Sequence, residues 1–419
     1  MIEKIMKAVK SGNKKRGRNI TIGAVVGMLL SCTTAMGGDN YLWIKDDSGT
    51  IKFSTNNSDP TGVDNPYGEN IWKGSAYINY MTLLGTDNNS SLSAYGVKLS
   101  GTLEEFKFIN NGSIAGIAEN TNIGSGIYNT GTIKELVNNG VIIGEATDSR
   151  NTTHGDGINN GQQTIIKLVN DGSIRGTGTE TMGTDPGMGY GIFNIDGNIG
   201  ELINNGSIIG IGTSRGGGHG IETGGRSDGI IYELVNNGSI TGIGTGTGET
   251  SGIGRSGKTG EVRELLNNGS IVGMGTGDSY GISDMGRGFL VNKGVIYGKN
   301  SAIVGYITGK NYGLLINETN ATIGGSVALE NNYGLIFKAA GGKYTAKDAA
   351  DYEKFGQTFN DEFIIGYEKQ GNGDFDKGKP IKEKFTIINA KAKGTGMANI
   401  TGTESLSLDN GILTDGKSK

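Results

Sequence analysis

Several residue types are scarce in this 419-residue chain, and each shortage excludes a class of protein. Cys32 is its only cysteine, so the chain cannot form an internal disulfide framework or a thiolate zinc site. Two histidines, His154 and His219, leave too few ligands for a zinc site built from imidazoles. Hydrophobic residues make up only 34% of the chain, less than ordinary globular cores need. We therefore expect no bound cofactor, no metal ion and no ordinary globular domain.

An excess of basic residues is also missing outside the N-terminus. The formal net charge is −4, although residues 1–37 contain seven lysines and arginines against Glu3 alone. The rest of the chain is therefore more acidic than the total suggests. Binding to a phosphate backbone needs clustered Lys and Arg, so we expect no nucleic-acid partner.

The N-terminal segment has the order of a signal peptide. Residues 1–18 are basic, residues 20–31 are apolar, and small residues follow up to Gly38. The apolar run is shorter than the roughly 20 residues that a permanent membrane helix requires. We expect cleavage between Gly37 and Gly38, and export of the remainder. Leu30-Ser31-Cys32 leaves an alternative open, in which Cys32 is acylated as in a lipoprotein.

Glycine, by contrast, is abundant, and it belongs to a repeat. From residue 108 a motif of two apolar residues, an asparagine, a turn and an isoleucine recurs eight times, at spacings of 25 to 34 residues. The first asparagines of the eight copies are Asn110, Asn138, Asn170, Asn204, Asn236, Asn267, Asn292 and Asn317. A shorter Gly-Ile element, such as Gly126-Ile127, lies between successive copies. Regular apolar spacing argues against a disordered low-complexity tract.

Variation among the copies predicts their geometry. The first asparagine is constant, whereas the second is replaced by Asp171 or Lys293, so we expect the first to be buried and the second exposed. Asn-Gly pairs favour tight turns with positive φ, which makes each copy strand, turn, strand. Stacked coils about 4.8 Å apart would bury the apolar rows. The sequence therefore predicts an all-β, right-handed parallel β-helix with a ladder of buried asparagines and an N-terminal β cap.

The chain divides into five segments by composition. We expect a signal peptide (1–37), an N-terminal cap with the first strands (38–107), the repeat β-helix (108–340), a charged excursion (341–384) and resumed β-helix strands that stop without a cap (385–419). The cap segment contains both tryptophans and shows no copy of the repeat. The excursion includes a possible short helix at 349–355.

Few motifs suggest catalysis. Residues 252–259 match the letters of a phosphate-binding P-loop, but the repeat follows where a helix would have to begin. Asp148 and Asp156 share one expected loop and Asp185 lies in the next, and paired acids cleave polysaccharides in some β-helices. We expect solvated loop carboxylates, and keep a polysaccharide-processing enzyme as the alternative function.

One further row of charges precedes the repeat. Its members are Lys107, Glu135, Lys167, Glu201, Glu233 and Glu264. Stacked coils would place these residues in one exposed stripe, in which the first four alternate in sign. We expect a solvated face, with cation binding as the alternative.

The segment from Arg16 to Gly27, followed by iterated Leu-Val-Asn-Asn-Gly-Ser-Ile, resembles the N-terminal part of autotransporter proteins of the type V secretion class. The resemblance implies a β-helical passenger at the cell surface or outer membrane, or secreted, which an outer-membrane translocation β-barrel carries and which acts in adhesion and virulence. No series of alternating strands of about ten residues follows the repeat. We expect either a truncated chain or another secretion route. The expected function is adhesin-like binding of a surface glycan or protein through corner loops, without enzyme activity.

Overall fold

The computed structural model describes most of the chain from Tyr41 onward. The described residues are 41–56, 59–87, 93–119, 123–148, 153–181, 186–225, 229–256, 260–284, 289–305, 313–317, 322–329, 333–338, 343–345, 356–369, 375–388, 407–409 and 412–414. They contain strands and no helix, and hence no helix of the length and apolarity that a membrane span requires. Gly37, Gly38, Cys32 and the possible helix at 349–355 lie outside them.

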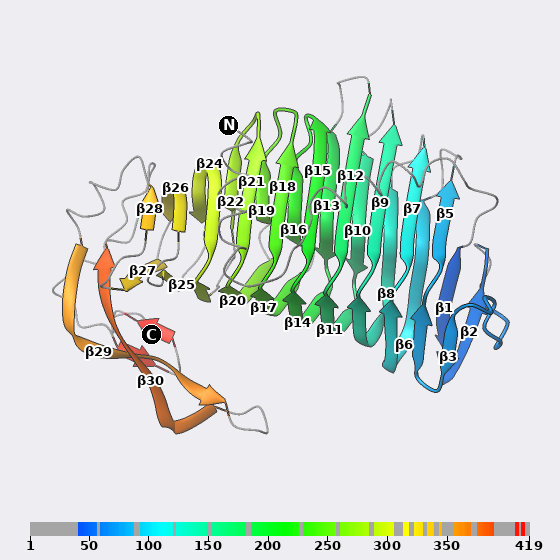
Figure 1. The fold of residues 1–419 in the computed structure, drawn as a ribbon, viewed down its shortest axis with the longest axis horizontal. Coiled ribbons are helices and arrows are strands. Elements are labelled where there is room, and N and C mark those ends of the chain that lie inside the picture. Colours follow the sequence, from blue (N-terminus) through cyan, green and yellow to red (C-terminus); the bar gives the residue numbers. More distant parts are fainter. Residues whose placement is uncertain are drawn as a thin grey trace. The chain divides into compact units, whose positions relative to one another are not determined.

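The strands form a β-solenoid in which successive coils pair in parallel (Figure 1). Each complete coil contributes one strand to each of three faces, named here the groove, asparagine and serine faces. The prediction of an all-β parallel β-helix is confirmed.

The groove face comprises β1 (Leu42–Asp47), the first parts of β6 (Ala94–Asn110) and β8 (Ile123–Asn138), β10 (Thr153–Gly161), β13 (Pro186–Ile195), β16 (Gly218–Gly224), β19 (Thr250–Ser256) and β22 (Ser279–Ile282). The asparagine face comprises β4 (Ala76–Asn79), the last parts of β6 and β8, β11 (Thr164–Asn170), β14 (Asn198–Asn204), β17 (Ile230–Asn236), β20 (Glu261–Asn267), β23 (Phe289–Asn292), β25 (Gly313–Asn317) and β27 (Tyr333–Lys338). The serine face comprises β5 (Thr82–Asp87), β7 (Ser113–Glu119), β9 (Val141–Asp148), β12 (Ser173–Glu180), β15 (Ser207–Ser214), β18 (Ser239–Gly244), β21 (Ser270–Gly275), the first parts of β24 (Val295–Gly305) and β26 (Thr322–Leu329), and β28 (Lys343–Thr345). The last parts of β24 and β26 continue the groove face beyond β22.

Rows of aliphatic side chains fill the interior of the solenoid. Leu168 of the asparagine face, Ile174 of the serine face and Ile158 of the groove face are fully buried, and their equivalents in neighbouring coils repeat the pattern. Burying one such side chain contributes about 1.5–3 kcal/mol relative to leaving it in water. One short strand cannot bury its own apolar face, so these rows explain why the coils stack.

The first asparagines form a hydrogen-bonded column inside the asparagine face. The side chains described, from Asn110 to Asn292, are fully buried. Each Nδ2 donates to Oδ1 of the next coil, as between Asn138 and Asn170 at 2.8 Å. Nδ2 of Asn138 also donates to the backbone carbonyl of Ser173 at 3.1 Å. Backbone pairing places Asn317 beside Asn292. The column thus satisfies amides that would otherwise be unpaired in the core.

Glycine in the Asn-Asn-Gly turns serves close packing, which corrects the expectation of positive φ. No left-handed φ occurs at Gly172, but a Cβ added there would lie 2.0 Å from the backbone oxygen of Gly140. A side chain at this position would therefore push neighbouring coils apart. The side chains of the second asparagines lie on the outer side of the turns, where Asn139 Nδ2 donates to Asn111 Oδ1 at 2.7 Å.

The repeat begins one coil earlier than its sequence pattern shows. Backbone pairing aligns Tyr77 with Phe108 and Asn79 with Asn110, and Asn79 Nδ2 donates to Asn110 Oδ1 at 2.8 Å. Residues 76–83 are thus a divergent copy within the segment expected to be a cap. Tyr80 and Met81 replace the usual turn residues and hide the similarity.

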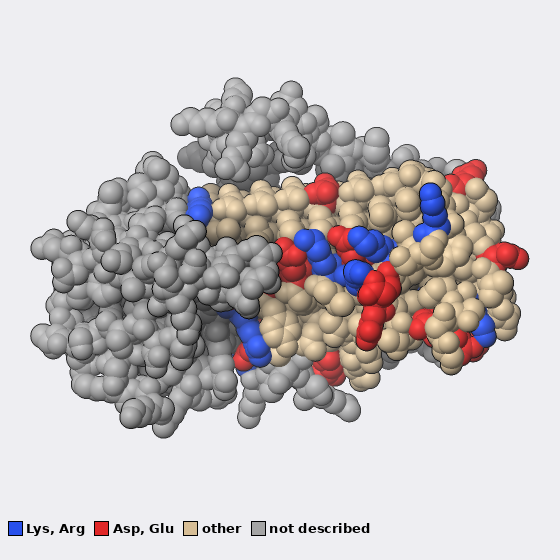
Figure 2. All heavy atoms as spheres, turned by 90° about the horizontal axis from the view of Figure 1, so that it is seen from below, with Lys and Arg blue, Asp and Glu red and all other residues tan. Residues whose placement is uncertain are grey.

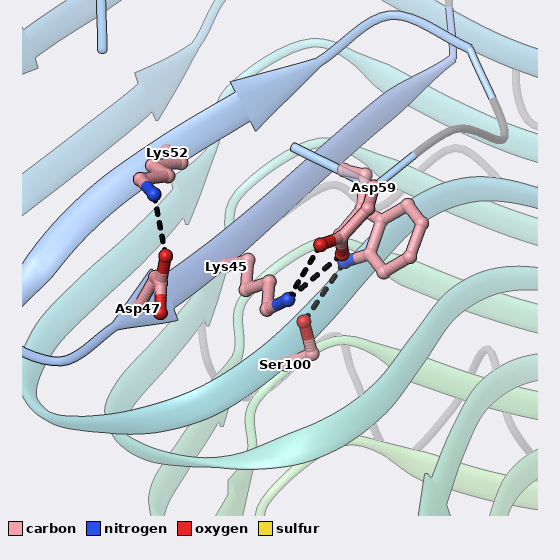
Figure 3. A network of polar contacts seen from close by, with 6 residues as sticks. Lys45, Asp47, Lys52, Asp59 and Ser100 are labelled. Carbon is pink, nitrogen blue, oxygen red and sulfur yellow. Dashed lines mark hydrogen bonds and ion pairs between the residues drawn. The ribbon is translucent and has the colours of Figure 1, made fainter. Parts of the chain in front are cut away.

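The N-terminal edge is covered by an antiparallel strand and a polar network. β2 (Thr50–Ser54) pairs antiparallel with β1, and β3 (Ile71–Lys73) with β4, which limits the exposed strand edge. Figure 3 shows Lys45 pointing to Asp59, with 2.8 Å between Nζ and Oδ1, and an adjacent pair formed by Lys52 and Asp47.

A tryptophan completes this cap. Trp43 Nε1 donates to Ser100 Oγ at 2.8 Å, which ties β1 to β6. The Lys98 ammonium lies 3.6 Å from the centre of a Trp43 ring. Lys98 is thereby held at the cap end of the groove face.

Beyond β28 the pairing changes from parallel to antiparallel. β29 (Gly356–Lys369) and β30 (Phe375–Ile388) form an antiparallel pair, and β30 also pairs antiparallel with β27. We expected residues 385–419 to resume the coils, whereas Phe385–Ile388 belong to β30. β31 (Ser407–Asp409) and β32 (Ile412–Thr414) pair with each other in an antiparallel sheet.

A candidate ligand-binding groove

The strands of the groove face bend, and the bend brings side chains three residues apart in one strand into contact. The rings of Tyr190 and Phe193 stack with their centres 4.4 Å apart. In a straight strand, residues three apart point to opposite faces. The contact therefore requires a bend between them, at the Gly-Ile element whose isoleucine, Ile192, points into the core.

Glycine permits this bend to pack tightly. A Cβ added to Gly157 would lie 2.5 Å from both the Gly191 backbone oxygen and the Cγ2 of Ile174. Both distances are too short for any side chain. The recurring Gly-Ile element is thus explained by a close approach between coils and between faces.

A surface groove of about 480 Å³ lies in the bend across β8, β10 and β13. Four of its lining residues carry aromatic rings: Tyr95, Tyr128, His154 and Phe193. Tyr95 and Tyr128, from adjacent coils, stack with ring centres 4.6 Å apart and planes inclined by 11°. His154 lies 5.9 Å from Phe193, measured between ring centres. Aromatic rings thus form part of the wall, as is common in small-molecule sites.

The rest of the lining consists of amides, one carboxylate, Thr130, Gly161 and two isoleucines, and none of the described lining residues is Lys or Arg. The amide and carboxylate groups belong to Asn159, Gln162, Gln163 and Asp196. Gln162 and Asp196 occupy the same corner in successive coils, and both adopt left-handed backbone angles, with φ of 63° and 59°. A non-glycine residue in this region costs on the order of 1–3 kcal/mol.

Hydrogen bonds between coils hold the strained corner. The backbone N–H of Gln162 donates to the carbonyl of Ile195 at 3.2 Å, and that of Asp196 donates to the carbonyl of Gly224 at 2.8 Å. These bonds fix both side chains at the rim of the groove.

A buried carboxyl group lies beneath the groove floor. Asp156 is fully buried, and its Oδ2 accepts hydrogen bonds from Asn159 Nδ2 at 2.6 Å and Ser125 Oγ at 3.4 Å. Its Oδ1 has no hydrogen-bond partner. Burial raises the pKa of Asp156 to about 7, because the charged form loses its hydration.

A second polar cluster lies further along the same face, closed to solvent. His219 Nδ1 is 2.7 Å from Ser251 Oγ and 3.3 Å from Glu222 Oε2. A Ser-His-acid relay needs the hydroxyl and the carboxylate on opposite ring nitrogens, so this geometry does not form one. Burial lowers the pKa of His219 to about 4, and burial together with the charge of Glu249 raises the pKa of Glu222 well above its ordinary value.

Of the three carboxylates that suggested catalysis, the two that the structure describes lie on different faces. Asp148 ends β9 on the serine face, whereas Asp156 lies within β10 on the groove face. Asp185 lies outside the described residues. The segment with P-loop letters is strand β19 up to Ser256, with no helix start in its described part.

The charged stripe on the asparagine face forms ion pairs between coils. Lys107 pairs with Glu135 and Lys167 with Glu201, each with 2.7 Å between nitrogen and oxygen. Figure 2 shows positive and negative side chains interleaved on one side of the molecule. Among the described side chains, no group of three or more His, Cys, Asp or Glu has the arrangement of a metal site.

The sequence pattern did not identify the aromatic groove, although a signal was present. Tyr128 and Phe193 directly follow the Gly-Ile element in their coils, where the next coils carry Glu222 and Gly254. The aromatic positions share a row only once the coils are aligned.

Comparison with family models, curated proteins and solved structures gives no match.

Proposed function

We propose that this chain is an exported β-solenoid that binds uncharged oligosaccharide in the groove of β8, β10 and β13. The observation that carries the proposal is the lining itself: among the described residues it combines aromatic rings and side-chain amides with one carboxylate, Asp196, and contains no Lys or Arg. A sugar ring has an apolar face of C–H groups and a rim of hydroxyls. Aromatic faces pack against the former, and amides exchange hydrogen bonds with the latter.

The row of Tyr128 offers one stacking surface beside a polar floor. Backbone register places Tyr128, Asn159 and Phe193 in one row on three successive coils. Phe193 is only 7% exposed and its ring centre lies 4.4 Å from that of Tyr190, so Phe193 closes the far side of the row. A sugar ring therefore packs on Tyr128 at about 3.5–4.0 Å. Asn159 forms the floor beside it.

The orientation of Tyr128 supports the same pose. Its ring centre is 4.6 Å from that of Tyr95, about one coil step, so these two rings stack along the solenoid. The other face of Tyr128 then turns toward the coil of Asn159. An oligosaccharide bound there would run across the bend, with further units beside Gln162, Gln163 and Asp196.

Binding is favoured over the alternative of polysaccharide cleavage. Glycoside hydrolysis requires two carboxyl groups about 5–10 Å apart on either side of the scissile bond. Asp196 is the carboxylate that lines the groove, and Asp156 lies buried behind Asn159. We further propose an adhesin-like role at a cell surface, based on the resemblance of residues 1–37 and the repeat to autotransporter passengers.

Calorimetric titration of the purified full chain with cello- and chito-oligosaccharides tests this proposal. We expect Tyr128→Ala to weaken binding at least about tenfold, or about 1.4 kcal/mol, because the stacking face is lost. The matched control is Tyr232→Ala, which removes an exposed tyrosine from the asparagine face and should leave affinity unchanged. Equal losses in both variants, or no binding of any neutral oligosaccharide, would refute the proposal. Oligogalacturonate, which is anionic, should bind more weakly.

A further inference from the structure

The amide of Asn159 is held from below by a carboxyl group that does not itself reach the groove. Asn159 Nδ2 donates to Asp156 Oδ2 at 2.6 Å, so the nitrogen end of the amide points down. The oxygen end lies beside the aromatic wall: a Cβ added to Gly161 would be 3.8 Å from both Asn159 Oδ1 and Cε2 of Tyr128.

We propose that Asp156 is a positioning residue that orients the Asn159 amide, so that the groove floor presents a hydrogen-bond acceptor to a ligand with an O–H or N–H donor. This inference rests on the proposed function and names the chemistry required at one point of the ligand. An ionised carboxylate can only accept hydrogen bonds. It therefore holds the –NH₂ end of Asn159, and the ligand meets the carbonyl end.

A protonated Asp156 would reverse this arrangement. Its O–H can donate to Asn159 Oδ1, which allows the amide to rotate by half a turn and present –NH₂ to the groove. For this reversal the proton lies on Oδ2, the oxygen that faces Asn159, and the Nδ2–H···Oδ2 bond is exchanged for an O–H···Oδ1 bond. Because burial raises the pKa of Asp156 to about 7, both forms are populated near neutral pH.

The other titratable groups around Asp156 keep a fixed charge in this range. Tyr95 on β6 and Tyr190 on β13 both sense the Asp156 charge, and their pKa values are raised, so both stay neutral. Burial lowers the pKa of His154, which also stays neutral. Ser125, on β8, and Asn159 do not titrate. Glu222, which pairs in register with Phe193, also has a raised pKa because of its burial, so a change in binding near pH 7 is assigned to Asp156 by its loss in Asp156→Asn.

The test compares cellohexaose with its O-methylated form, which has lost its O–H donors and gained methyl groups; the size difference is the same at every pH, so only the pH dependence of the preference is interpreted. Each is titrated into the full chain at about pH 5.5 and about pH 8.5, on either side of the Asp156 pKa of about 7. We expect the preference for the unmethylated sugar to be about tenfold greater at the higher pH, because ether oxygens cannot donate to the Asn159 carbonyl. Asp156→Asn keeps the shape but removes the titration, so its preference should not change with pH.

The outcomes separate this inference from the proposed function. A pH-dependent preference in the wild type that Asp156→Asn abolishes supports the inference. Binding with the same preference at both pH values, or the same pH dependence in Asp156→Asn, overturns it and leaves carbohydrate binding intact. Failure of both probes, and of chitohexaose, to bind at either pH overturns the inference together with the proposed function.

Discussion

The asparagine face and the groove face share one coil spacing but differ in how their rows change along the solenoid. In the asparagine face, Asn138, Asn170 and Asn204 repeat the same bonds at 2.8 Å from coil to coil. In the groove face, the row that contains Tyr128 continues with Asn159 and then Phe193. Identical rows stabilise the stack, whereas a row that changes at every coil can form a site with defined chemistry.

The comparison extends to buried polar groups. Buried asparagines are neutral and paired along the ladder, but the groove face buries the ionisable groups Asp156, His219 and Glu222. Such groups tie the stability of the fold to pH. The faces should therefore respond differently to titration and to substitution.

The largest effect should come from titrating the groove face. The pKa of Asp156 is about 7 in the folded state against an ordinary value of 3.8, so the folded state binds the proton more tightly. Its contribution to stability is fully present below about pH 3.8 and is lost as pH rises through about 7, on the order of 4 kcal/mol. We expect Asp156→Asn to be more stable than the wild type at pH 8, in urea unfolding monitored by circular dichroism.

In Asp156→Asn, the free energy of unfolding should still fall as pH rises, because Glu222 also has a raised pKa. On the acid side the sign reverses, since burial lowers the pKa of His219 to about 4. That contribution is present above about pH 6.5 and is lost as pH falls through about 4. Parallel stability curves for the wild type and Asp156→Asn from pH 4 to pH 8 would contradict the assignment to Asp156.

A smaller effect should follow from breaking the ladder of the asparagine face. Asn170→Ala removes the acceptor for Asn138 Nδ2 and the donor to Asn204 Oδ1, both at 2.8 Å in the core. We expect a loss of about 2–3 kcal/mol, independent of pH between 5 and 8, since unsatisfied buried groups cost about 1–3 kcal/mol each. Asn139→Ala, on the exposed edge, is the matched control and should change stability by no more than about 0.5 kcal/mol.

Thermal and urea unfolding of the two variants measure this difference. Equal losses of stability for Asn170→Ala and Asn139→Ala would show that the buried first asparagines contribute no more than the exposed second asparagines. A pH-dependent loss in Asn170→Ala would show instead that the two faces are coupled.

The repeating rows could be predicted from the sequence, while the groove could not. Constant positions such as Asn170 carry their geometry in the alignment of copies, because each copy solves the same packing problem. Tyr128 and Phe193 have no counterpart in most coils, so only the register of the stacked coils brings them to one groove. The first coil was missed for a similar reason, since Tyr80 and Met81 replace the Asn-Gly turn.

Asp156 illustrates a second limit of the sequence. It was expected in a loop as a solvated carboxylate, yet it lies fully buried within β10. A charged residue in a Gly-rich stretch usually indicates exposure, and its burial here depends on Ser125 and Asn159 from two different coils. The contact of Asp156 with Ser125 on the neighbouring coil is not encoded in local composition.

The smallest expected effect concerns the ion pairs that also join coils of the asparagine face. Lys167 Nζ and Glu201 Oε2 are 2.7 Å apart, but both side chains are about one third exposed. Exposed pairs contribute about 0.2–1 kcal/mol because water and salt screen them. We expect a coupling energy of about 0.5 kcal/mol in a double-mutant cycle of Lys167→Ala and Glu201→Ala at low salt, falling toward zero in about 1 M NaCl. A coupling that equals the loss in Asn170→Ala and persists at high salt would mean that surface charges, and not the buried amides, set the register of the coils.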